Sequence, residues 1–71
     1  MASARVGCFV VQDDDAMRFD VVETSDDEWL LTRVDAAQQQ GRKVRYYSVE
    51  SPNAVEQELL GRGFNRGSVR L

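Results

Sequence analysis

The segment VGCFVV, residues Val6–Val11, constrains the fold more than any other part of the sequence. Successive side chains of a β-strand point to opposite faces of its sheet. In this segment valine lies on both faces, with Cys8 on one and Phe9 on the other, so neither face is polar. The pattern predicts a strand over Arg5–Gln12 that is covered on both sides or lies in an interface.

Turn and cap residues divide the next part of the chain into a strand and a helix. A strand over Met17–Glu23 follows an aspartate-rich turn, and two strands joined by so short a turn form a hairpin. Its alternation of apolar and polar residues predicts that Asp20 faces outward. A helix then begins at Ser25, which with Glu28 fits a capping box, and ends at Gly41.

The second half repeats the change from strand to helix. A strand over Lys43–Glu50 precedes a helix over Pro52–Arg62, since proline is favoured at the first helical position. If Gly63 is the left-handed residue that ends this helix, Phe64 folds back onto the helix in a Schellman motif. The last residues, Gly67–Leu71, are expected to form a short fourth strand.

The element order β-β-α-β-α-β indicates a small α+β or α/β fold. We expect a two-layer sandwich, in which both helices lie on one face of a three- or four-stranded mixed sheet. The 71 residues are enough for one domain, which we expect to span residues 1–71. The other face of the sheet would then be open and partly apolar, and such a face is a common place for a partner.

Cysteine and histidine usage excludes several kinds of site. The chain has one cysteine, Cys8, and no histidine, so it can form neither an internal disulfide nor a Cys/His zinc site. A calcium loop that starts at Asp13 fails as well, because Arg18 stands where glycine is needed and Thr24 where glutamate is needed. Cys8 has no histidine to activate it. We therefore expect no enzymatic activity, no metal and no cofactor.

Acidic residues are concentrated in one short stretch. Eight of the twelve acids lie between Val11 and Glu28, where the only base is Arg18. Turn formation, helix capping and solubility each account for such charge, and so does a protein-binding face. The sequence leaves open whether the hairpin turn and the helix start lie at the same end of the sheet. The candidate protein-binding residues are Asp13, Asp14, Asp15, Asp20, Asp26, Asp27 and Glu28.

These features favour a non-enzymatic module that binds another protein as an inhibitor, adaptor or modulator. Small acidic proteins of this size are frequent among inhibitors that phages and mobile elements direct at bacterial defence or nucleic-acid machinery; the analogy is one of size and charge. A lone cysteine suits a reducing compartment, and the N-terminal apolar run is too short for a signal peptide or a membrane span. We expect a cytoplasmic protein, in its own cell or in a phage host, and a homodimer is one way to support so small a core.

A nucleic-acid-binding module is the alternative. Basic and aromatic residues are mixed in the C-terminal half, where arginine can contact phosphate and tyrosine can stack on a base. The net charge of −3 weighs against this alternative. Its candidate residues are Arg42, Lys43, Arg45, Tyr47, Arg62 and Arg66.

Overall fold

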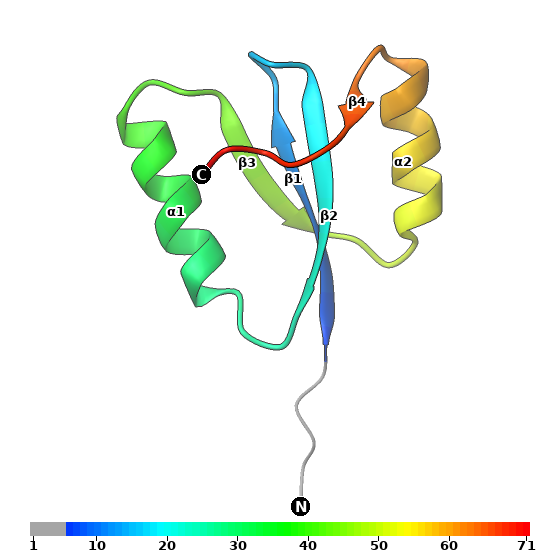
Figure 1. The fold of residues 1–71 in the computed structure, drawn as a ribbon. Helices are drawn as coiled ribbons and strands as arrows, with labels where there is room; N and C mark the ends of the chain where they lie inside the picture. The colour runs from blue at the N-terminus through cyan, green and yellow to red at the C-terminus, as the bar shows by residue number, and fades with distance from the viewer. Residues whose placement is uncertain (1–5) are drawn as a thin grey trace, which may run out of the picture.

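The computed structural model describes residues 6–71, which form six elements around one sheet (Figure 1). The four strands lie in the order β3-β1-β2-β4. β1 pairs antiparallel with both β2 and β3, whereas β4 pairs parallel with β2. A small α+β fold with a mixed sheet and the order β-β-α-β-α-β is thereby confirmed. In chain order the elements are β1 (Gly7–Asp13), β2 (Arg18–Thr24), α1 (Glu28–Gln39), β3 (Val44–Ser48), α2 (Pro52–Gly61) and β4 (Asn65–Arg66).

β1 is a central strand that is covered on both faces, as its sequence predicts. Val10 and Val11 are neighbours in the chain, and both are buried. They belong to two separate apolar clusters, because alternate side chains of a strand face opposite sides. The hairpin with β2 is also confirmed, and its register runs from Gly7 opposite Thr24 to Asp13 opposite Arg18.

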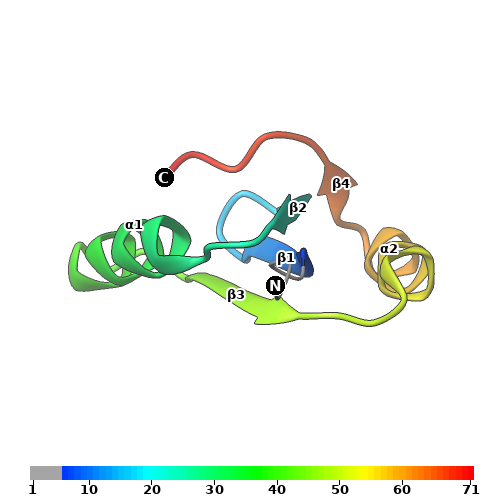
Figure 2. The same cartoon turned by 90° about the horizontal axis from the view of Figure 1, so that it is seen from below.

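The two helices pack on opposite faces of the sheet (Figure 2). One cluster joins α1 to β1 and β3, and the other joins α2 to β1 and β2. No helix in residues 6–71 is long and apolar enough to cross a membrane. The buried residues on the α1 face are Val11, Leu30, Val34, Ala37 and Val44. Those on the α2 face are Val10, Phe19, Leu59 and Phe64.

The expected two-layer arrangement, with both helices on one face, is therefore wrong. The reason lies in the connections, since α1 joins β2 to β3 and α2 joins β3 to β4, and each of these pairs of strands is parallel. Both crossovers are right-handed, which is the rule for such connections (Figures 1 and 2). They cross the sheet in opposite directions, so the same hand places their helices on opposite faces. In residues 6–71, each face of the sheet therefore packs against one helix.

Glycine ends both helices by adopting a left-handed backbone. Gly41 has φ 84° and Gly63 has φ 93°, a region that costs little energy only for glycine. At the end of α2 the Phe64 N–H donates to the Leu59 carbonyl at 3.0 Å, and the Gly63 N–H donates to the Leu60 carbonyl at 3.1 Å. These two bonds define a Schellman motif, and Phe64 packs in the same cluster as Leu59. The predicted helix ends are confirmed.

The fourth strand is shorter and earlier than predicted. β4 comprises only Asn65 and Arg66, and Gly67–Leu71 is not a strand. The C-terminal segment instead crosses in front of β2 toward α1 (Figures 1 and 2). There Val69 and Leu71 are partly buried against the α1-face cluster, so their apolar character reflects the packing of the crossing segment itself.

Candidate functional site

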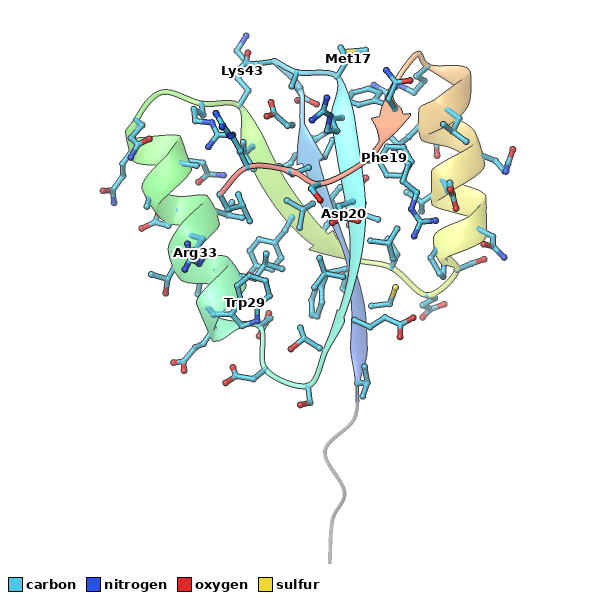
Figure 3. The ribbon with its side chains drawn as sticks, in the orientation of Figure 1. Met17, Phe19, Asp20, Trp29, Arg33 and Lys43 are labelled. Carbon is cyan, nitrogen blue, oxygen red and sulfur yellow. The ribbon has the colours of Figure 1, made fainter. Side chains whose placement is uncertain are left out.

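A cavity of about 270 Å³ lies between α1, β2 and the C-terminal segment. Its floor is apolar and is formed by β1, β2 and the buried side of α1. Figure 3 shows Asp20 on β2, and Trp29 and Arg33 on α1. The lining residues are Val11, Asp20, Val22, Trp29, Leu30, Arg33, Val69 and Leu71.

Asp20 is half-buried in the wall of this cavity. It lies opposite Val11 in the hairpin register and so shares the α1 face with it. Its Oδ1 accepts a hydrogen bond from the Val21 N–H at 2.9 Å. The expectation that Asp20 faces outward is wrong because β2, like β1, has both of its faces covered, here by the C-terminal segment.

Trp29 and Arg33 lie four residues apart on one flank of α1, next to the stripe that is buried against the sheet. The Trp29 side chain is 46% exposed, which leaves a large aromatic surface at the cavity. Within residues 6–71 the ion pairs join other residues, and none joins Asp20 to Arg33. The cavity therefore presents an indole, a carboxylate and a guanidinium around an apolar floor.

The acids at the start of α1 make only local contacts. The Asp26 Oδ1 accepts a hydrogen bond from the Glu28 N–H at 3.0 Å, and the Thr24 Oγ1 accepts one from the Asp26 N–H at 3.1 Å. Asp27 is the residue that precedes the helix, and its side chain makes no capping bond. The predicted capping box of Ser25 and Glu28 is therefore wrong, because Asp26 supplies the acceptor. All three acids still lie where the helix dipole favours negative charge.

Asp13, at the hairpin end, is a structural residue. It is buried, and its Oδ1 accepts hydrogen bonds from the N–H groups of Asp15 and Ala16, both at 3.0 Å. Its Oδ2 lies 3.3 Å from Nη2 of Arg42, which precedes β3. This carboxylate therefore shapes the turn and ties it to the loop between α1 and β3.

The two acids after Asp13 also have partners within the chain. The Asp14 Oδ1 accepts a hydrogen bond from the Gln12 Nε2 at 2.7 Å, and the Asp15 Oδ2 accepts one from the Lys43 N–H at 3.1 Å. Lys43 lies at the hairpin end of the sheet (Figure 3). Asp13, Asp14 and Asp15, which the sequence offered as protein-binding residues, thus each bond within their own chain.

The two acidic groups lie at opposite ends of β2, which answers the question that the sequence left open. The hairpin turn precedes β2 and α1 follows it, so the length of the strand separates them (Figure 1). Of the seven candidate acids, Asp20 lies between the two ends and lines the cavity. The structure therefore does not form one continuous acidic patch.

The candidate nucleic-acid-binding residues are also divided. Arg42 pairs with Asp13, and Arg66 pairs with Glu56 at 3.1 Å. The Arg45 guanidinium lies 6.0 Å from the centre of the Tyr47 ring, on the α2 face. Arg62 lies 5.8 Å from the centre of the Phe64 ring. The basic side chains thus mainly cover apolar and acidic neighbours of their own chain.

Tyr47 has a role in the core on the α2 face. Its ring packs against the cluster of Val10, Phe19 and Leu59, and its hydroxyl donates to the Gln12 Oε1 at 2.8 Å. Burial raises the pKa of the Tyr47 phenol, and the nearby Arg45 guanidinium offsets part of this rise. A ring packed in this way is poorly placed to stack on a base.

Among residues 6–71 no three cysteine or acidic side chains are grouped so as to hold a metal ion. Cys8 is half-buried and has a free thiol. The arrangement around the cavity is suited to binding, because it offers apolar contact and two opposite charges.

The comparisons with known proteins found no matching family model, no matching curated protein and no matching solved structure. Sequence reasoning missed Trp29 and Arg33 as site residues, although both lie beside the apolar stripe of α1. A tryptophan at such a margin was the available signal, because a large aromatic residue that is not in the core is often in a binding surface.

Proposed function

We propose that the protein is a non-catalytic module that binds a segment of a partner protein. The binding surface, here called the Trp29 site, consists of Asp20, Trp29 and Arg33 around the cavity, together with the acidic start of α1 at Asp26–Glu28. The observation that carries the proposal is the half-exposed indole of Trp29 at a cavity of about 270 Å³. Exposed tryptophans at pockets are typical anchors of protein interfaces.

The chemistry of the site favours a basic segment with one aliphatic anchor. An aliphatic side chain would fill the apolar floor and remove the Trp29 ring from water. A lysine or arginine beside the anchor would meet Asp20 and the acids of Asp26–Glu28, and it could also lie over the indole. Arg33, at the same cavity, would accommodate a backbone carbonyl or an acid of the segment.

The acidic start of α1 supports this choice over the hairpin end. The Asp13–Asp15 carboxylates are engaged by Arg42, Gln12 and the backbone of their own chain. The Asp26–Asp27–Glu28 carboxylates make no ion pair within the part of the chain that the structure describes. Size and acidity favour an inhibitor, adaptor or modulator in the cytoplasm, with phage-type inhibitors of bacterial defence as the analogous class.

Selection of peptides from a random display library tests the proposal without a known partner. We expect the immobilised protein to enrich peptides that carry an aliphatic residue next to lysine or arginine. Trp29→Ala should weaken their binding by roughly a hundredfold, the usual effect of removing an aromatic anchor. Leu60→Ala is the matched control, because Leu60 is also exposed, at 44%, but lies on α2.

A charge test separates the cavity from the acids around it. Asp26→Asn keeps the side-chain oxygen that caps α1 and removes only the charge, and Asp20→Asn does the same for the bond to Val21. Each should weaken the enriched peptides several-fold and reduce the salt dependence of binding. Failure to enrich any peptide, or equal loss with Trp29→Ala and Leu60→Ala, would contradict the proposal.

A further inference from the structure

The outer edge of β3 is uncovered, and it differs in this respect from the opposite edge of the sheet. On the opposite edge, β4 pairs with β2 at Arg18 and Phe19, and the C-terminal segment runs past the strand. On the outer side of β3 no strand pairs within residues 6–71. Figure 2 shows α1 and α2 flanking the two faces of the sheet, and neither lies along the outer edge of β3.

The backbone groups that face outward from β3 belong to Val44, Tyr46 and Ser48. The Asp14 N–H donates to the Lys43 carbonyl, and the Val49 N–H donates to the Cys8 carbonyl. Bonded positions alternate along an antiparallel pair, so the residues between Lys43 and Val49 at even numbers turn their backbone away from β1. The Gln38 side chain already donates to the Val44 carbonyl. A carbonyl oxygen has two lone pairs, so the whole row, including the Val44 carbonyl, is a template for another strand.

We propose that two copies of the chain pair through β3, antiparallel about a two-fold axis at Tyr46. This register sets Val44 opposite Ser48 of the second copy, so the outward backbone groups of each strand meet those of the other. It also sets Arg45 opposite Tyr47 of the second copy. The pairing joins two four-stranded sheets into one continuous sheet and does not depend on the Trp29 site.

Charge selects this register over its neighbours. With the axis at Tyr46, the two Arg45 residues do not lie opposite each other. Each lies opposite a tyrosine ring, the kind of partner that Arg45 already has within one chain. Just beyond the strand, Arg42 lies opposite Glu50 of the second copy, which is a favourable pair. A shift that moves the axis to Arg45 would place two arginines directly opposite each other. A shift the other way would leave Val44 without a strand partner.

An exposed leucine on α1 supports the same surface. Leu31 is 52% exposed and lies two helical turns before Gln38, on the same side of α1. Because the Gln38 side chain reaches the edge of β3, Leu31 is also on the flank above that edge. A two-fold axis perpendicular to the sheet keeps both α1 helices on one face. Because α1 runs opposite to β3 (Figure 1), Leu31 lies toward the Ser48 end of the strand and then faces the end of the second copy's α1, near its Gln38. The pairing would remove both Leu31 side chains from water.

Sedimentation velocity over a concentration series tests the proposal with the full chain. We expect the wild type to show the mass of two copies at high micromolar concentration. Ser48→Pro should weaken association roughly tenfold or more, because the N–H it removes faces outward and proline is tolerated at a strand edge. Leu31→Asp should act in the same direction, whereas Leu60→Asp, on α2, should leave association unchanged.

Hydrogen exchange identifies the surface directly. The amide protons of Tyr46 and Ser48 should become protected as the concentration rises and the dimer forms. A single-copy mass at the highest concentration would overturn the proposal. A dimer that persists equally in Ser48→Pro and Leu31→Asp, with Tyr46 and Ser48 unprotected, would overturn it as well. Neither outcome bears on peptide binding at Trp29, so the two proposals fail independently.

Discussion

The hairpin end and the start of α1 carry the same kind of acidic sequence but use it differently. At the hairpin end, Asp13 is buried and bonded to its own turn and to Arg42. At the start of α1, the Asp26 carboxylate accepts a hydrogen bond only from the nearby Glu28 N–H, and Asp27 makes no capping bond. One group holds two loops together, and the other leaves its charge on the surface. A run of acids in a sequence therefore does not indicate whether its charge is available to a partner.

Of the changes that test this difference, Asp13→Ala should have the largest effect on the free energy of unfolding. The change removes the acceptor of two turn N–H groups and the partner of Arg42, so we expect a loss of about 2 kcal/mol in the free energy of unfolding. The matched change Asp26→Ala removes one exposed acceptor and should cost about 0.5 kcal/mol. Urea denaturation measures the loss of stability in each variant. Equal losses would contradict the view that only the hairpin acids are structural.

Tyr47→Phe should have the next largest effect on stability. The Tyr47 hydroxyl donates to Gln12, and the Gln12 side chain in turn donates to Asp14 at the hairpin end. The change leaves the buried Gln12 Oε1 without its phenol donor, at a cost of about 1 kcal/mol.

Tyr47→Phe should also alter the alkaline limb of stability. The folded protein raises the pKa of Tyr47, so the folded state binds the phenol proton more tightly than the unfolded chain. The corresponding stability is complete below the ordinary pKa of 10.0 and is lost as the pH rises through the folded value. Denaturation at several alkaline pH values should show a shallower decline in the variant, and an unchanged decline would argue against this assignment.

The smallest effect should be the coupling between Asp13 and Arg42. The two side chains are only partly exposed, at 9% and 31%, so a double-mutant cycle with alanine should give about 0.5 kcal/mol. The control cycle pairs Asp26 with Arg42, which lie at opposite ends of the sheet, and should be additive within about 0.3 kcal/mol. Coupling of the same size in both cycles would mean that the effect at Asp13 is not specific to its contact.

Sequence patterns predicted the elements of this fold better than their arrangement. The doubly apolar β1 and the Schellman glycine at Gly63 were predictable, because strand alternation and left-handed backbone are local properties. The faces chosen by the helices were not, since they depend on the direction in which each crossover traverses the sheet. The sequence nevertheless indicated that both faces are covered, because a strand that is apolar on both faces must pack against something on each.

The site was only partly predictable for a similar reason. Asp20 was recognised as a candidate, but its place in a cavity depends on Val69 and Leu71 crossing from the far end of the chain. Such a non-local contact leaves no pattern in a window around Asp20. The partners of Asp13 were equally hidden, since Arg42 is 29 positions away in the sequence.

The separate burial of Val10 and Val11 has a consequence for how this protein can change over generations. Each valine belongs to its own core, so a substitution on the α2 face need not disturb the side chains under α1. Residues around Phe19 and Leu59 can be substituted, by evolution or by design, while the cavity beside Trp29 keeps its shape. A small chain of this kind can therefore vary its interior on the α2 face without altering the proposed Trp29 site on the α1 face.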